Sequence, residues 1–388
     1  MQYRKNLLKL LLLFFLILFI GAGIVLLKGR TYEWVFVYYM SYDNDLSRYA
    51  GTILRDLKKG IINSKIALVV QADYADRTGM KRISLYPSYG RPRRKEIFLE
   101  SENSADPAEL KKYFRWVQTK WKAKNYCVIF LNHGGRLNDM CRDDRPLKKR
   151  NGNNASNVRQ WLPAVEAGKI VADFNKNVEG KVKLLFLQQC GRATLQNLYN
   201  FLDAAEYIMA SPVIVGAPNT YYTKTLTSLA RDPNVTGNIL AETIMQEDEH
   251  YTLYTLVSNS ELKKLPEKLA PVLKSFDQES KLNPPQSCSQ IFEYDDEKFY
   301  DLKAYFQALD SANNGIANGE IDDFLDWCEE HLIVSKAVQK SGLSNESHHF
   351  GLSIYVPSNQ EQIERYDFLP FHQETAFRDI FDFVRDSK

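Results

Sequence analysis

The chain has 388 residues, and its 50 lysines and arginines against 48 aspartates and glutamates give a formal net charge of +2. Hydrophobic residues make up 44% of the chain and charged residues 25%, which is typical of globular proteins and excludes an intrinsically disordered one. The mean hydropathy of −0.38, with a single long apolar run, excludes a protein with several membrane spans. A net charge this small also argues against nucleic acid as a partner.

The N-terminal segment is basic and is followed by an unbroken apolar run from Leu10 to Leu27. A helix of this length nearly matches the thickness of a bilayer's hydrocarbon core. A cleaved signal peptide usually has a shorter apolar core and a small-residue cleavage site, which the Gly21–Gly23 segment matches poorly. We therefore predict that residues 1–30 are an uncleaved signal anchor, with a cleaved signal peptide as the alternative. The remainder of the chain then lies outside the cytoplasm, either held at the membrane by residues 10–27 or secreted.

The five cysteines are scattered along the chain and show neither a Cys-x-x-Cys pair nor another metal-ligand spacing. Their number is odd, so disulfide pairing in an exported chain would leave at least one thiol free. A free thiol is therefore available for chemistry.

From residue 31 onward, short apolar runs alternate with amphipathic segments. Buried strands are predicted at 34–39, 66–71, 126–131, 182–187, 207–210 and 213–216, and a hairpin at 82–100 with the basic Arg91–Lys95 cluster at its tip. Helices are expected near 45–58, 107–122 and 194–205. Strands separated by helices in this way are typical of βαβ units. We predict an α/β core over residues 31–235, whose mostly parallel sheet lies between helices.

Beyond residue 235 the pattern is mostly helical. Helices are expected near 236–248, 261–280, 297–310 and 319–335, with one further strand at 352–356. We predict that residues 236–388 form a helix-rich C-terminal region that packs on the core.

Two predicted strands end in reactive side chains. The strand at 126–131 is followed by NHGG, which contains His133, and the strand at 182–187 by QQCG, which contains Cys190. Ligands of open α/β sheets bind beyond the carboxyl ends of the strands, so we expect both side chains to face one crevice. There the imidazole can support a thiolate and then protonate a leaving amine. From the residues alone, a small core cysteine and an incidental loop histidine are the alternative.

The glycines beside these residues fit the same chemistry. Gly134 allows a tight turn of the backbone after His133. Its N–H and that of Cys190 are candidate donors to a developing oxyanion.

With these residues in view, the chain resembles the caspase-like cysteine peptidases, in which His-Gly follows one strand and a cysteine follows the next. The spacing from His133 to Cys190 is close to the roughly 50 residues found in caspases. Within that group the chain is most similar to the clostripain family, over about residues 33–357. The similarity is carried by VYYMSYDNDL at 37–46, FLNHGG at 130–135, EYIMAS at 206–211, YDL at 300–302 and GLSIYVP at 351–357.

The resemblance implies a caspase-like fold and a cysteine endopeptidase with Cys190 as nucleophile and His133 as general acid and base. It requires no third catalytic residue. Family members typically have Asp-Ala-Cys at the nucleophile, and this aspartate lines the pocket for a P1 arginine or lysine. Gln188 stands at that position here, so the charge partner of a basic side chain is missing. An acidic and a neutral P1 residue both stay open.

The resemblance also implies maturation by cleavage between the histidine and the cysteine. Lys148, Lys149 and Arg150 lie between them and are the candidate processing site, with an ordinary solvated loop as the alternative. Some members of the family use calcium, although no segment of this sequence marks a calcium or other metal site. Asp73 and Arg77 follow the second strand and are further candidates to line the cleft.

The sequence therefore predicts an exported thiol protease that is membrane-anchored or secreted, acts on protein or peptide substrates and needs no cofactor. The alternative is a catalytically silent caspase-like scaffold that binds a peptide or partner at the cell surface, which the presence of Gln188 favours. A non-proteolytic cysteine hydrolase or transpeptidase is a third alternative.

Overall fold

The structure is a computed structural model, and it describes residues 30–75, 79–101, 103–146, 158–276, 282–285, 288, 290–339 and 349–381. The apolar run at 10–27, Arg77 and the candidate processing residues Lys148–Arg150 lie outside these ranges. Within the described ranges, no helix is both long enough and apolar enough to cross a membrane.

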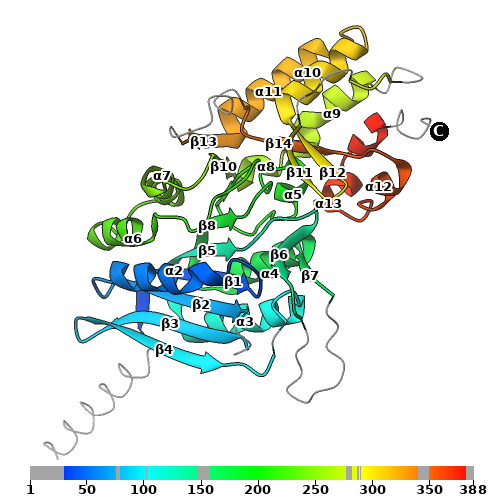
Figure 1. The fold of residues 1–388 in the computed structure, drawn as a ribbon. Coiled ribbons are helices and arrows are strands. Elements are labelled where there is room, and N and C mark those ends of the chain that lie inside the picture. The colour runs from blue at the N-terminus through cyan, green and yellow to red at the C-terminus, as the bar shows by residue number, and fades with distance from the viewer. Residues whose placement is uncertain are drawn as a thin grey trace, which may run out of the picture.

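A nine-stranded sheet runs through the described part of the molecule (Figure 1). Its five central strands are parallel, and two antiparallel strands extend it at each edge. In sheet order the strands are β13 (Ile333–Val338), β10 (Leu253–Ser258), β9 (Tyr207–Ala210), β8 (Lys181–Gln188), β5 (Lys122–Leu131), β1 (Thr31–Tyr42), β2 (Ile66–Tyr74), β3 (Lys81–Ser88) and β4 (Arg91–Phe98).

Helices cover both faces of this sheet, and β1 shows how the sequence fits that arrangement. Trp34, Phe36 and Tyr38 belong to one apolar cluster, whereas Val35 and Val37 belong to the cluster on the opposite face. Successive side chains of a strand alternate between faces, so a strand buried on both faces is apolar throughout. The first cluster includes helices α2 (Ser47–Gly60), α6 (Tyr222–Arg231) and α7 (Gly237–Glu247), and the second includes α3 (Pro107–Lys120) and α4 (Ala164–Asn177).

The four long parallel strands predicted from apolar runs are confirmed as β1, β2, β5 and β8. The hairpin is also confirmed, but its turn is Tyr89-Gly90, where both residues have positive φ. The basic Arg91–Lys95 cluster therefore lies along the exposed edge strand β4 and not at the tip. The strand expected at 213–216 is wrong, because this segment makes only an isolated bridge from Val215 to Tyr251.

The C-terminal region contains more strands than its sequence pattern predicts. β10 and β13 extend the main sheet, and β11 (Gln290–Tyr294), β12 (Glu297–Asp301) and β14 (Ser353–Val356) form a separate antiparallel sheet. The helix expected at 319–335 is wrong in its second half, which turns through a π-helical segment, Cys328–Leu332, into β13. The helices here are α8 (Asn259–Leu262), α9 (Leu265–Phe276), α10 (Leu302–Ala312), α11 (Asn318–Trp327), α12 (Gln360–Glu364) and α13 (Pro370–Glu374), followed by a 3-10 turn at Phe377–Phe381.

The division of the chain at residue 235 stays a prediction. Because strands from after that residue hydrogen-bond into the main sheet, the C-terminal region is continuous with the core.

Candidate active site

His133 and Cys190 follow directly on two paired strands. β5 and β8 run parallel, and Leu131 at the end of one is in register with Gln188 at the end of the other. Both side chains line one small pocket of about 70 Å³. The pocket is lined by Tyr42, Leu46, Asn132, His133, Gln188, Gln189, Cys190, Val215, Gly216, Ala217 and Asn219.

The thiol of Cys190 lies against the backbone of Val215. The Val215 N–H donates to Sγ at 3.3 Å, and the thiol donates to the Val215 carbonyl at 3.8 Å. Burial raises the pKa of Cys190, and the Val215 N–H and the charge of Arg192 only partly oppose this. The thiol thus needs a neighbouring base to become a nucleophile near neutral pH.

The turn after Cys190 depends on a glycine. Gly191 has φ +68°, in the left-handed region that side chains disfavour. A Cβ there would also lie 2.4 Å from ring carbons of Phe292, which belongs to β11. The second sheet therefore packs directly behind the residue that follows Cys190.

His133 has a carboxylate partner. Its Nε2 lies 2.9 Å from Oδ1 of Asp45, and Nη2 of Arg142 donates to the same oxygen at 2.6 Å. Burial lowers the pKa of His133, the Asp45 hydrogen bond raises it, and the charge of Arg142 lowers it again, with a net decrease. The imidazole is therefore mostly neutral at pH 7, as a proton acceptor must be.

Two side chains near Cys190 hold the segment that follows His133. Gln189 Nε2 donates to the His133 carbonyl at 3.0 Å. Arg192 is fully buried, and its guanidinium donates to the carbonyls of Cys190 at 3.1 Å, Gly135 at 2.8 Å and Asp139 at 2.8 Å. These hydrogen bonds connect the loop after β5 to the loop after β8.

Gln188 is buried at one side of the pocket and its amide is fully engaged. Oε1 accepts from the Tyr221 hydroxyl at 2.8 Å, and Nε2 donates to Tyr222 Oη at 3.2 Å and to Asn219 Oδ1. Asn219 in turn donates to the buried carboxylate of Asp248 at 2.6 Å. The two side chains that line the pocket here are neutral amides, and the carboxylate lies behind them.

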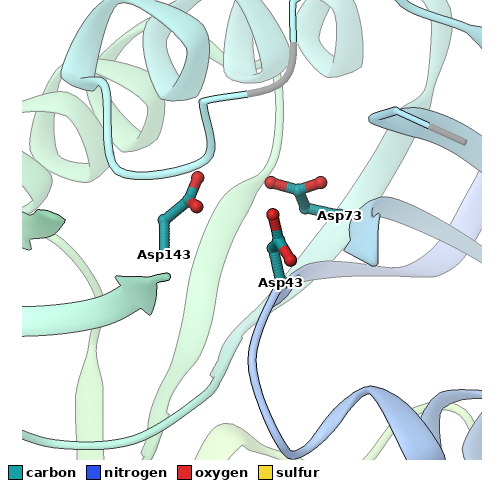
Figure 2. A group of neighbouring side chains, drawn as sticks. All are labelled: Asp43, Asp73 and Asp143. Atoms are coloured by element: carbon teal, nitrogen blue, oxygen red, sulfur yellow. The ribbon is translucent and has the colours of Figure 1, made fainter. Parts of the chain in front are cut away.

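Three buried carboxylates gather at the carboxyl ends of β1 and β2. Asp43, Asp73 and Asp143 point toward one another, with oxygens within 4.8 Å (Figure 2). Oxygen ligands suit calcium, but Arg145 already supplies a guanidinium to Asp43 at 2.8 Å, and the Ser104 N–H binds Asp143 at 3.0 Å. Burial raises the pKa of Asp143 to about 6. These residues fit an internally paired cluster rather than an open calcium site.

Asp73 belongs to this acidic cluster, so the expectation that it lines the cleft is wrong. It is buried and is not among the residues around the pocket of Cys190 and His133.

The sequence model of the clostripain family matches residues 38–382. The chain belongs to the clostripain family. This match takes in β5, β8, the pocket and the second sheet, and it confirms the predicted enzyme class, a cysteine peptidase. A comparison with curated proteins gives no match.

Solved structures of clostripain-type proteins share the fold. An inactive zymogen C11 protease from Parabacteroides distasonis has a TM-score of 0.66 at 16% identity, covering 90% of this chain and 99% of that one. A secreted C11 cysteine protease from Bacteroides thetaiotaomicron, in complex with an irreversible peptide inhibitor, has a TM-score of 0.62 at 16% identity, covering 88% and 99%. The predicted α/β fold with a central, mostly parallel sheet between helices is confirmed.

Sequence patterns did not indicate several residues of this clostripain-family site. Asp45 fits a turn and helix cap in the sequence, although α2 begins at Ser47 without a side-chain cap from it. Arg192 and Asn219 stand in no recognisable motif. Two signals exist: Asp45 lies in the VYYMSYDNDL segment that carries the family resemblance, and Arg192 lies two residues after Cys190.

Proposed function

We propose that this protein is an exported cysteine endopeptidase that hydrolyses peptide bonds with Cys190 as nucleophile and His133 as general acid and base. The observation that carries the proposal is that the two side chains follow adjacent parallel strands and line one pocket. The glycine-flanked turns on either side support it, because they bring the two loops into contact at the pocket.

In the proposed reaction, His133 takes the thiol proton as Sγ attacks the scissile carbonyl carbon. The tetrahedral oxyanion collapses, the C–N bond breaks, and the imidazolium gives its proton to the leaving amine. Water then attacks the thioester, loses a proton to His133, and releases the carboxylic product and the thiol. We assign oxyanion binding to the N–H groups of Gly134 and Cys190.

The contact between Gly134 and Cys190 supports that assignment. A Cβ on Gly134 would lie 2.0 Å from the Cys190 carbonyl oxygen, so only glycine allows this approach. Two backbone segments this close can present their N–H groups to a single oxygen.

The P1 residue that fits the pocket best is uncharged. A P1 arginine or lysine needs a buried carboxylate with free oxygens. Behind Gln188 and Asn219 lies the buried carboxylate of Asp248, whose Oδ2 already accepts from Asn219 at 2.6 Å and from the Tyr254 hydroxyl at 3.1 Å. We therefore propose a neutral P1 side chain.

We also propose that the enzyme acts outside the cytoplasm. One solved relative is described as secreted and another as a zymogen, which supports export and a processing step. The apolar run at 10–27 is the proposed membrane anchor or signal, and Lys148–Arg150 the proposed processing site.

The test uses the full-length protein, Cys190→Ala and His133→Ala with a peptide library of fixed P1 residues, and identifies products by mass spectrometry. Cleavage by the wild type alone, after neutral residues, is the expected result. Cleavage retained by Cys190→Ala would refute the assignment. No cleavage by folded wild type, with or without calcium and prior nicking at Lys148–Arg150, would favour the silent binding scaffold.

Two substitutions of Gln188 test the pocket. Gln188→Asp places a carboxylate beside Asn219 and should raise cleavage after arginine or lysine, whereas the neutral control Gln188→Asn should not. If Gln188→Asp and Gln188→Asn cleave after the same P1 residues at the same rates, the P1 pocket is formed elsewhere.

A further inference from the structure

We propose that Asp45 is a positioning residue for His133, binding the imidazole through Nε2 so that Nδ1 serves the thiol and the leaving group. The inference rests on the proposed function, because it concerns the same histidine. It adds a carboxylate to a pair of residues for which the family resemblance requires no third member.

The hydrogen bond that carries the proposal joins His133 Nε2 to Asp45 Oδ1 at 2.9 Å. His133 and Cys190 line the pocket, whereas Asp45 does not. Because Nε2 is hydrogen-bonded to Asp45, Nδ1 is the ring nitrogen that remains available to the thiol of Cys190. A neutral imidazole that donates from Nε2 has a bare Nδ1, which is the form that accepts a proton.

A buried amide network sets Asp45 at this distance. Asn44 is 4% exposed and donates to Asn132 Oδ1 at 3.1 Å, while its own Oδ1 accepts from the Leu46 N–H at 3.0 Å. The backbone N–H of His133 binds the same Asn132 oxygen at 2.5 Å. The residue before Asp45 and the residue before His133 are thus joined directly, so the two side chains share one rigid support.

Arg142 moderates the charge of Asp45. Its Nη2 donates to Asp45 Oδ1 at 2.6 Å, and its Nε lies 3.0 Å from Asp144 Oδ1. Burial raises the pKa of Asp45, but the hydrogen bond from His133 and the charges of His133 and Arg142 outweigh it, so the pKa is lowered overall. Asp45 is therefore ionised across the neutral range and stabilises the imidazolium formed when Cys190 gives up its proton.

The expected effect is moderate. Fully buried carboxylates that orient a catalytic histidine are worth about 10⁴-fold in rate. The Asp45 side chain is 55% exposed and shares its oxygen with Arg142, so solvent and the guanidinium screen it. We expect removal of the Asp45 carboxylate to lower the reactivity of Cys190 about three- to tenfold.

The test measures alkylation of Cys190 by iodoacetamide in the full-length protein between pH 5.5 and 9.5, quantified on the Cys190 peptide by mass spectrometry. This readout needs no substrate. Asp45→Ala should lower the rate about three- to tenfold near pH 6.5 and leave it within about twofold at pH 9.5, where hydroxide replaces the base. Asp45→Glu, which keeps the charge, should recover part of the lost rate.

Asp144→Ala is the matched control, because Asp144 also pairs with Arg142 but acts on His133 only through its charge, without a hydrogen bond. It should stay within about twofold of the wild type at every pH. Equal losses in the Asp144 and Asp45 variants, or a wild-type profile for Asp45→Ala, would overturn the inference. If His133→Ala also keeps the wild-type profile, the Cys190–His133 pair itself fails, which separates the failure of the proposed function from that of Asp45.

Discussion

Arg192 is a large charged side chain that is only 1% exposed, and its hydrogen bonds explain why the fold accepts it. The guanidinium donates to the Cys190 carbonyl and to carbonyls of the 135–139 segment. Burial lowers the pKa of Arg192, while the charges of Asp139 and Glu297 raise it. Arginine stays charged even so, so the bonds are charge-assisted.

Replacing this guanidinium should cost both stability and activity. Arg192→Met fills similar volume but leaves several buried carbonyls without donors, each of which costs about 1–3 kcal/mol. We expect the free energy of unfolding to fall by about 3–5 kcal/mol, measured by urea denaturation, with loss of peptidase activity. The control is Arg159→Met, because Arg159 is 53% exposed and pairs with Asp144, and we expect a change within about 0.5 kcal/mol. A loss below about 1 kcal/mol in Arg192→Met would contradict this role.

At the residue scale, the sequence predicted His133 and Cys190 because the ends of parallel strands converge at one edge of a sheet. Asp45 and Arg192 could not be predicted in this way. A local pattern assigns Asp45 to a turn and leaves Arg192 at the surface, because their partners lie far away in the chain. Only the folded backbone brings the carbonyls of residues 135–139 to Arg192.

The loop after β5 lies very close to the loop after β8, so we expect a single added methyl group to distort the backbone there. Gly134→Ala places a Cβ 2.0 Å from the Cys190 carbonyl oxygen, which is backbone and cannot move aside cheaply. We expect a loss of peptidase activity of at least tenfold with an altered near-UV circular dichroism spectrum.

Gly51→Ala is the matched substitution. Gly51 lies in α2 with nothing within 4 Å of its added Cβ, so alanine should stabilise the helix by about 0.5–1 kcal/mol and leave activity unchanged. Equal activities of the Gly134 and Gly51 variants would show that the two loops separate without cost.

At the element scale, strands buried on both faces were the easiest to predict, since a continuous apolar run has few other interpretations. β13 was missed because its residues are mostly half-buried and include Ser335 and Lys336, so it shows no apolar run. β10 is short and lies between two predicted helices, and no element was predicted for its residues. Pairing with β9 and β13 decides its conformation.

The two halves of the chain are hydrogen-bonded to each other beside the candidate active site. Glu297 of β12 is fully buried and accepts from the Leu137 N–H at 2.7 Å, four residues after His133. The Tyr366 hydroxyl donates to the same carboxylate at 2.5 Å. The family match across residues 38–382 agrees with this arrangement, in which the C-terminal region supports the loops that carry His133 and Cys190.

At the scale of the whole molecule, we expect acid stability to depend on His372, which does not line the pocket of His133 and Cys190. His372 is half-buried and packs against Phe371 and Phe377, and desolvation lowers its pKa to about 4, with Asp367 opposing and Arg378 assisting. The unfolded chain, with an ordinary pKa near 6.5, binds a proton between these values that the folded chain does not. The stabilisation from neutral His372 is therefore present above about pH 6.5 and is lost as the pH falls toward 4.

His372→Leu removes this titration and should make the free energy of unfolding less sensitive to acid. Between pH 7.5 and 4.5, we expect the variant to lose about 2–3 kcal/mol less than the wild type, measured by urea denaturation at both values. His331→Leu is the control, because it makes the same substitution at a histidine whose side chain is 57% exposed. If the His372 variant loses as much stability in acid as the wild type, His372 is protonated in the folded chain and other groups set the acid limit.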